Sequence, residues 1–539
     1  MTGVHWLAFG VALLAAAPVA LAAPLDPDAP PADLSPTSAT LQQVLAAHKQ
    51  AIGQAGASAG ATTETWTLKR GDLTGTWKYL EAGDDYRMDE TLGKLHRAEG
   101  SFHDQAWDQD YNGYTVLDTG LHRRDEINRK ALAAASQGGS GVTLVGESAK
   151  PAAFVVKINP PGGRVEYRFY DKSTYQLVRK ERSIDGLRVV TTYDDFRTRD
   201  GVTAPWHEHV TDGRPFNEED FTLQSAQHQP SVDDAALRIP PDLRNPVTLE
   251  APRVTLPAKI IADRVIVTVE IKGRKVNLQL DSGAYGILLD RSVADALKLE
   301  EFGRATGSTA GTYETTQALV PEMKLGKASL KDVVVDATRY VEWEDSKTPV
   351  AGLMGFDLIA GCVVVIDYQA GTVEALDPNT FSAPPGATAL PIRLDDRVPV
   401  IAAHIGAATG EGFILDTGAD RSVLFSAFVA AHKAETADQG LGEAKLIAFP
   451  FIPKAFGVGG EFHVRPVEVT SLGLGSITLP HWLFDATENA AKTFESEDLD
   501  GLIGQDVLRN FVVYLDYRHK MIYLTPNERF RQRWSLPPA

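Results

Sequence analysis

The stretch Phe413–Leu424, FILDTGADRSVL, runs from three apolar residues into Asp416-Thr417-Gly418-Ala419 and then back to apolar residues. This pattern predicts a short buried strand that ends in a tight turn with a carboxylate at its tip. An isolated charge is costly in a buried position, which singles out Asp416 as a candidate functional group. A second stretch, Val276–Leu289, reads VNLQLDSGAYGILL and places Asp281 in the same relation to its own strand.

A second pair of blocks repeats further along the chain. Gly352–Pro378 aligns with Gly501–Pro526; each block begins with Gly-Leu-x-Gly-x-Asp and contains an Asp-Tyr pair. Insertions of different length separate the blocks in the two copies. The sequence therefore predicts a duplication of one structural unit.

With two such turns and two such blocks, residues 259–528 resemble the two lobes of a pepsin-type aspartic protease, and more closely the retropepsin-like bacterial branch. The resemblance implies that Asp281 and Asp416 form a catalytic dyad. Hydrolysis of a peptide bond needs one group that accepts a proton from water and one that donates a proton. Two adjacent carboxyl groups provide both, because like charges at short range share one proton.

The residues next to the two acids have implied supporting roles. The Ser282 and Thr417 hydroxyls are expected to hydrogen-bond across a pseudo-twofold axis, and Gly283 and Gly418 leave backbone N–H groups open to the carboxylates. An alanine follows in both copies, where pepsins more often have a hydroxyl, so we expect activity at milder acidity than pepsin's. The metal-dependent alternative lacks an H-E-x-x-H motif, and we expect neither metal nor cofactor.

Two polar, glycine-containing segments match the positions of the family's flaps. Residues 307–316 include Tyr313, which either covers substrate or is a plain surface tyrosine, and residues 457–462 include Gly459. A third Asp-Thr-Gly triplet, Asp118-Thr119-Gly120, precedes a charged run instead of an apolar strand. We interpret that triplet as a turn without a catalytic role.

Residues 38–228 predict one helix, with Ser38 as its cap and Gly53 as its stop, followed by many short segments of alternating polarity. This arrangement is similar to the curled antiparallel half-barrel of periplasmic lipoprotein-carrier proteins. The resemblance implies a hydrophobic or lipid ligand. The alternative is a structural domain with a solid core.

The expected fold is mainly β: a curled half-barrel with a helix, followed by a bilobal pair of acid-protease β-barrels. The predicted divisions are a signal peptide at 1–23, a disordered tether at 24–37, the half-barrel at 38–228, a proline-rich linker at 229–258, lobe 1 at 259–380, lobe 2 at 381–528 and a C-terminal tail at 529–539.

The composition of the chain predicts its cellular compartment and excludes some classes of partner. The uncharged apolar run at 1–23 predicts export to the periplasm or medium, with an uncleaved anchor as the alternative. Cys362 is the only cysteine among 539 residues, which rules out an intramolecular disulfide. A net charge of −18 argues against nucleic-acid binding. We predict a monomeric aspartic endopeptidase acting on polypeptides; the alternative is a non-catalytic binding protein of the cell envelope.

Overall fold

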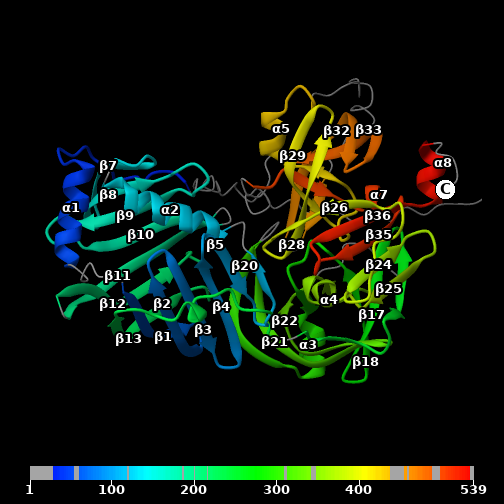
Figure 1. The fold of residues 1–539 in the computed structure, drawn as a ribbon, viewed down its shortest axis with the longest axis horizontal. Coiled ribbons are helices and arrows are strands. Elements are labelled where there is room, and N and C mark those ends of the chain that lie inside the picture. Colours follow the sequence, from blue (N-terminus) through cyan, green and yellow to red (C-terminus); the bar gives the residue numbers. More distant parts are fainter. Residues whose placement is uncertain are drawn as a thin grey trace, which may run out of the picture.

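A computed structural model describes residues 28–534, apart from 54–59, 118–120, 137, 185–186, 200, 215, 244, 309–311, 341–347, 437–453, 458–459 and 488–497. The described chain is mainly β, as predicted, with a large sheet followed by two lobes (Figure 1). The predicted signal peptide, the third triplet and Gly459 lie outside the described residues. Among the described helices, none has the length and apolar character to span a bilayer.

The N-terminal domain is one antiparallel sheet of 13 strands in the order β6-β5-β4-β3-β2-β1-β13-β12-β11-β10-β9-β8-β7. Its strands are β1 (Ala61–Arg70), β2 (Leu73–Ala82), β3 (Asp85–Leu92), β4 (Leu95–Phe102), β5 (Gln105–Gln109), β6 (Thr115–Leu117), β7 (Val142–Ala149), β8 (Ala152–Ile158), β9 (Glu166–Asp171), β10 (Leu177–Ile184), β11 (Leu187–Arg199), β12 (Val202–Thr211) and β13 (Glu219–Gln229).

The sheet is curled, as the position of helix α2 (Leu121–Ala135) shows. The helix joins the two edge strands and contacts β5 near one edge and β7 and β8 at the other. A helix of this length spans about 22 Å, whereas the edges of a flat sheet of 13 strands would be about 57 Å apart. The sheet must therefore curve around α2.

Helix α1 (Leu41–Ile52) covers the same region, with Val44 buried beside Phe154 and Tyr170. The predicted cap at Ser38 is wrong by two residues. Thr40 caps the helix, because Gln43 stands three residues later and completes a reciprocal capping box.

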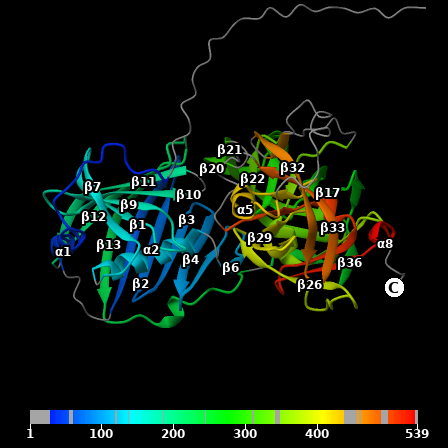
Figure 2. The same cartoon turned by 90° about the horizontal axis from the view of Figure 1, so that it is seen from above.

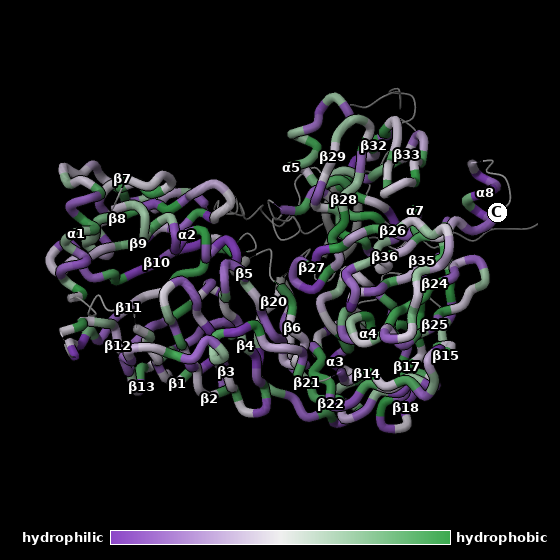
Figure 3. The backbone as a smooth tube through the Cα atoms, in the orientation of Figure 1, coloured by the Kyte–Doolittle hydropathy of each residue, from purple (hydrophilic) through white to green (hydrophobic). Residues whose placement is uncertain are grey.

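A cavity of about 580 Å³ lies within the curled sheet. Its lining includes Trp66 and Trp77 but also Glu64, Lys180 and Glu208. Burial raises the pKa of Glu208 to about 7. The hydropathy of the backbone tube is mixed along these strands (Figure 3). The domain therefore has no solid core at this position, and the lining of the cavity mixes aromatic and charged side chains.

Two predicted boundaries need correction. The described part of the 24–37 tether is attached to the sheet: Leu34 packs against the buried cluster of Val155 and Phe169, and Asp33 accepts a hydrogen bond from Ser148 at 2.8 Å. The predicted tail at 529–539 contains most of α8 (Glu528–Trp534), whose Phe530 is buried against Phe511. A few polar and apolar contacts anchor each segment, and such contacts leave no periodic pattern.

The proline-rich segment 229–258 is also more than a linker. It contains a short 3-10 helix (Asp234–Ala236) and two edge strands, β14 (Val247–Leu249) and β15 (Arg253–Thr255). β14 pairs with β22 of lobe 1, and β15 pairs with β25 of the sheet between the lobes. Proline is tolerated next to edge strands, which need fewer ladder hydrogen bonds.

Lobe 1 is built on a nine-stranded sheet that contains β14. Its other elements are β16 (Ala258–Ile261), β17 (Arg264–Ile271), β18 (Arg274–Leu280), β19 (Ile287–Asp290), β20 (Glu300–Ser308), β21 (Thr312–Leu325), β22 (Ala328–Thr338), β23 (Gly352–Met354), α3 (Arg291–Leu297) and α4 (Phe356–Gly361).

Lobe 2 is built on an eight-stranded sheet. Its elements are β27 (Arg393–Asp395), β28 (Val398–Ile405), β29 (Ala408–Leu415), β30 (Val423–Leu424), β31 (Lys454–Gly457), β32 (Gly460–Leu474), β33 (Ile477–Thr487), β34 (Gly501–Ile503), α5 (Ser426–Ala431) and α7 (Gln505–Leu508).

A six-stranded sheet joins the lobes in the order β15-β25-β24-β35-β36-β26. Its strands besides β15 are β24 (Val363–Asp367), β25 (Thr372–Leu376), β26 (Thr388–Pro391), β35 (Phe511–Asp516) and β36 (Met521–Pro526). β24 of lobe 1 pairs directly with β35 of lobe 2, and buried side chains of both strands belong to one core that continues through the two lobes.

The two lobes share one pattern of strand pairing. In lobe 1, β18 runs parallel to β23, β23 runs antiparallel to β19, and β19 runs parallel to β22. In lobe 2, β29, β34, β30 and β33 are paired in the same way.

The N-terminal domain docks against lobe 1 and lies beside both lobes when seen from above (Figure 2). Leu68, Leu92 and Leu95 form a buried cluster against which Phe302 and Val334 of lobe 1 pack. The domain is therefore attached by side-chain packing as well as by the chain connection.

Candidate active site

The two candidate aspartates stand at the ends of central strands. Asp281 directly follows β18, and its N–H donates to the Met354 carbonyl at 3.0 Å. Asp416 directly follows β29, and its N–H donates to the Ile503 carbonyl at 2.9 Å. The parallel neighbours β23 and β34 thus hold each strand end in place.

Ser282 and Thr417 connect the two turns across the lobe interface. Thr417 Oγ1 accepts from the Ser282 N–H at 2.9 Å and donates to the Leu280 carbonyl at 3.1 Å. Ser282 Oγ accepts from the Thr417 N–H at 2.9 Å and donates to the Leu415 carbonyl at 2.7 Å. Both side chains are buried. These four hydrogen bonds lock the turns against each other.

Gly283 and Gly418 allow the carboxyl groups to approach. A Cβ atom on Gly283 would lie 2.7 Å from Cγ of Asp416, and one on Gly418 would overlap the Asp281 carboxyl group. The N–H of Gly283 donates to Asp281 Oδ1 at 2.8 Å, and that of Gly418 donates to Asp416 Oδ1 at 2.7 Å. Any larger residue would push the two acids apart.

The Asp281 and Asp416 side chains hydrogen-bond to each other. Burial, together with the negative charge of Asp416, raises the pKa of Asp281 well above its usual value. Burial also raises the pKa of Asp416. Two carboxyl groups in this position share one proton, so one can accept a proton while the other donates one.

Three further side chains hold the backbone of these turns. Gln279 Nε2 donates to the Gly418 carbonyl at 2.8 Å, Gln505 Nε2 donates to the Thr417 carbonyl at 2.5 Å, and the Tyr517 hydroxyl donates to the Ser282 carbonyl at 3.4 Å. Sequence reasoning missed all three. Tyr517 belongs to the repeated Asp-Tyr pair, which was a usable signal, but each glutamine occurs in one copy only.

The first flap candidate lies in the β20–β21 hairpin. Tyr313 is half-buried, and its hydroxyl hydrogen-bonds to Tyr285, which follows the Asp281 turn. Burial raises the pKa of Tyr313 to about 12. The structure thus links this hairpin to the turn of lobe 1.

A family model described as aspartyl protease matches residues 267–358, a span that contains the whole Asp281 turn and Asp357. These residues belong to an aspartic-protease-like fold. The crystal structure of the aspartic proteinase from Irpex lacteus is similar to 52% of this chain and to 98% of its own chain, with 12% identity and a TM-score of 0.33. No curated protein sequence matches. Within the described part of this aspartic-protease-like fold, no group of three or more His, Cys, Asp or Glu side chains is placed to hold a metal ion.

Proposed function

We propose that the protein is an aspartic endopeptidase in which Asp281 and Asp416 activate a water molecule. One observation carries this proposal: two partly buried carboxyl groups from different lobes hydrogen-bond to each other, and buried cross-lobe hydrogen bonds hold their turns in place. A retained scaffold without turnover would not need two acids in this unfavourable arrangement.

In the proposed reaction, the ionised carboxylate takes a proton from water while the oxygen of that water bonds to the substrate carbonyl carbon. The protonated carboxyl group gives its proton to the carbonyl oxygen. The tetrahedral intermediate then collapses and the C–N bond breaks: the carboxyl group that gained a proton in the first step gives it to the leaving nitrogen, and the other carboxylate takes a proton from a hydroxyl of the intermediate. The dyad returns to its singly protonated state.

The test is incubation of the full chain with an unfolded protein substrate from strong to mild acidity, with and without pepstatin, beside the Asp281→Asn and Asp416→Asn variants. We expect cleavage that pepstatin blocks and that either substitution reduces by at least about 1,000-fold, within the range that acid–base catalysis supplies. Cleavage that is indifferent to both substitutions would refute the proposal. Activity of Asp281→Asn alone would instead indicate that Asp416 pairs across a homodimer.

The 580 Å³ cavity of the N-terminal domain favours a second role in ligand binding. If the wild-type protein cleaves no substrate, the protein is better described as a binding protein that keeps a protease fold. We also propose a periplasmic or secreted monomer, on the basis of the apolar run at 1–23 and the single cysteine. Cell fractionation and mass photometry test these two points.

A further inference from the structure

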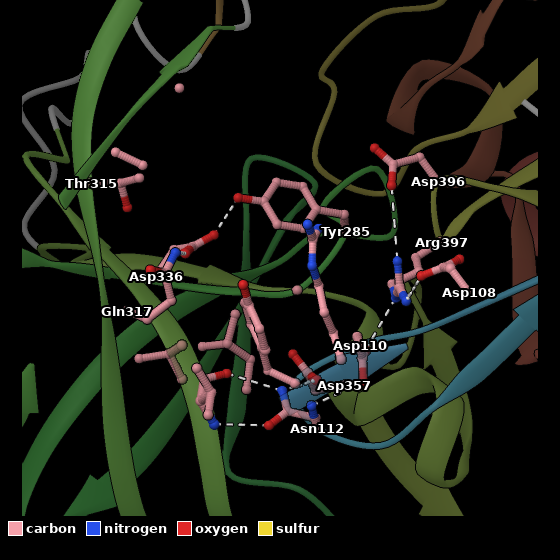
Figure 4. A pocket seen from close by; sticks show the side chains of 18 of the residues that line it. Asp108, Asp110, Asn112, Tyr285, Thr315, Gln317, Asp336, Asp357, Asp396 and Arg397 are labelled. Atoms are coloured by element: carbon pink, nitrogen blue, oxygen red, sulfur yellow. Dashed lines mark hydrogen bonds and ion pairs between the residues drawn. The ribbon is translucent and has the colours of Figure 1, made fainter. Parts of the chain in front are cut away.

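A second cavity, of about 400 Å³, lies where the N-terminal domain meets the two lobes (Figure 4). Its volume is within the range of ligand sites. Tyr285 and Gly286, which follow the Asp281 turn, line it together with Tyr313 of the β20–β21 hairpin. Because an extended chain advances at most about 3.5 Å per residue, Tyr285 lies within about 14 Å of Asp281 along the backbone. The cavity is therefore within reach of a peptide bound at the dyad.

The lining of this cavity is strongly acidic. It contains six carboxylate residues and two arginines. One of these arginines, Arg397, already forms ion pairs with Asp108 and Asp110. Asp336 accepts hydrogen bonds from the Tyr285 hydroxyl and, at 3.1 Å, from Gln317 Nε2, but it has no cationic partner among the described residues.

Asp357 is a buried carboxylate that is only half satisfied. Its exposed fraction is 2%, and its Oδ1 accepts from Asn112 Nδ2 at 2.7 Å. Its Oδ2 has no partner with good hydrogen-bond geometry in the described structure, and besides Asn112 only the Ile287 backbone N–H and the charge of Arg397 lie near enough to oppose the rise in its pKa. Burial, together with the nearby Asp110 carboxylate, raises the pKa of Asp357 to about 7. A buried acceptor that is incompletely satisfied is costly, and a bound donor would relieve that cost.

In lobe 2, a side chain of the protein itself supplies a donor at the equivalent position. Leu288 pairs with Asp336 in lobe 1 and Val423 pairs with Asp485 in lobe 2, so Asp336 and Asp485 occupy equivalent positions. Two residues before Leu288 and Val423, ahead of strands β19 and β30, Gly286 is the counterpart of Arg421.

In lobe 2 that arginine neutralises the acids around it. Arg421 Nε lies 2.6 Å from Asp485 Oδ2. Its charge also opposes the rise that burial causes in the pKa of Asp506, the counterpart of Asp357. Lobe 1 keeps both acids but has glycine in place of the arginine, and the 400 Å³ cavity opens beside them.

We propose that this cavity binds the cationic side chain of a substrate residue, arginine or lysine, in the position beside Asp336 and Asp357 that Arg421 holds in lobe 2. The inference rests on the proposed peptidase function and narrows its substrate class to chains with a basic residue near the scissile bond. A guanidinium group fits best, because its planar donors can reach two carboxylates at once.

The test uses the full chain and unstructured peptides that are acetylated and amidated at their ends, with one arginine moved along an otherwise uncharged sequence. Matched peptides carry lysine or neutral citrulline in place of the arginine. A second set of citrulline peptides has a free amino terminus, which tests the charge of the terminus separately. We expect kcat/KM to be about 10- to 100-fold higher for arginine than for citrulline at one position, as expected for hydrogen bonds to a charged group. A preference only for the free amino terminus would overturn the proposal.

Two variants distinguish this site from a general charge effect. Gly286→Arg inserts an internal guanidinium, and its Cβ would lie 3.4 Å from Asp357 Oδ2, an ordinary contact. We expect the ratio of arginine to citrulline cleavage to fall to about 1 in Gly286→Arg and to fall also in Asp336→Asn. Asp485→Asn, the matched change in lobe 2, should keep the wild-type ratio.

The two proposals fail differently. Dyad-dependent cleavage with equal rates for arginine and citrulline peptides would overturn the cationic site and leave the peptidase function standing. If no dyad-dependent cleavage occurs, the Asp416→Asn full chain is titrated with fluorescent versions of the same peptides. Tighter binding of the arginine peptide, lost in Asp336→Asn, would support the site without turnover, and equal binding of all peptides would overturn it.

Discussion

Burial raises the pKa values of Asp281 and Asp416 in the folded protein, and the negative charge of Asp416 raises the pKa of Asp281 further. An acid whose folded pKa lies above its unfolded value of about 3.9 contributes full stability only below that unfolded value. The contribution is lost as the pH rises through the folded pKa. The dyad therefore destabilises the fold at neutral pH.

We accordingly predict that Asp416→Asn raises the thermal stability more at pH 7 than at pH 4. Each unit by which burial raises the pKa corresponds to about 1.4 kcal/mol of unfolding free energy that the amide recovers. Thermal unfolding at both pH values measures the effect. Glu322→Gln, on the half-exposed surface of β21, is the control and should show no such difference. An equal change at both pH values would contradict the raised pKa values.

Asn112 of the N-terminal domain supplies a hydrogen bond that lobe 1 lacks and that lobe 2 makes with a residue of its own. In lobe 2, the Ser422 hydroxyl donates to Asp506 Oδ1 at 2.8 Å. In lobe 1 the equivalent residue is Ile287, and Asn112 from the loop between β5 and β6 supplies the hydrogen bond to Asp357 instead. Asn112 also exchanges hydrogen bonds of 3.0 and 2.8 Å with the Val334 backbone. The loop therefore takes part in the structure of lobe 1.

Asn112→Ala should destabilise the whole chain by about 2 kcal/mol or more, because it leaves the Asp357 carboxylate and the Val334 backbone groups without partners. Chemical denaturation measures the loss, and limited proteolysis should show faster cleavage near the β5–β6 loop. Asn379→Ala, on an exposed turn, is the matched control. Unchanged stability of Asn112→Ala would mean that this loop does not hold the lobe.

At the level of elements, the strand-turn-strand patterns around Asp281 and Asp416 correctly predicted the central strands of both lobes. The alternating segments likewise predicted the antiparallel meander. The linker and tail predictions were wrong because β14, β15 and α8 are short and are held by neighbours distant in the sequence. Periodicity reports which face of a segment is buried, and a segment of three residues is too short to show it.

In the whole molecule, Arg397 ties lobe 2 to the N-terminal domain. It stands in the β27–β28 turn and is 8% exposed. Its Nε lies 3.1 Å from Asp110 Oδ2, its Nη2 contacts Asp108, and its Nη1 lies 3.9 Å from Asp396 Oδ1. A buried cation with two carboxylates on another domain gives a contact that depends on all three charges. The N-terminal domain and the lobes should therefore unfold together.

Arg397→Met should lower stability by about 3 kcal/mol, because it leaves two acids near the interface without their cation. We expect calorimetry to show one transition for the wild type and a separate, earlier transition of the N-terminal domain in the variant. Arg253→Met, which breaks an exposed ion pair with Glu374, serves as the control and should cost less than about 1 kcal/mol. A single unchanged transition in Arg397→Met would contradict the coupling.

The sequence by itself determined the two acid-bearing turns, the repeated blocks, the mainly β class and the residues Ser282, Gly283, Thr417 and Gly418 beside the acids. These features are local, because the order of apolar and polar residues along a strand reflects the burial of that same strand. Only the tertiary structure decided that the two carboxyl groups hydrogen-bond to each other, that Asn112 does in lobe 1 what Ser422 does in lobe 2, and that Asp336 and Asp357 face a cavity. Each of these depends on side chains more than 100 positions apart or on the packing of whole domains, which no local pattern records.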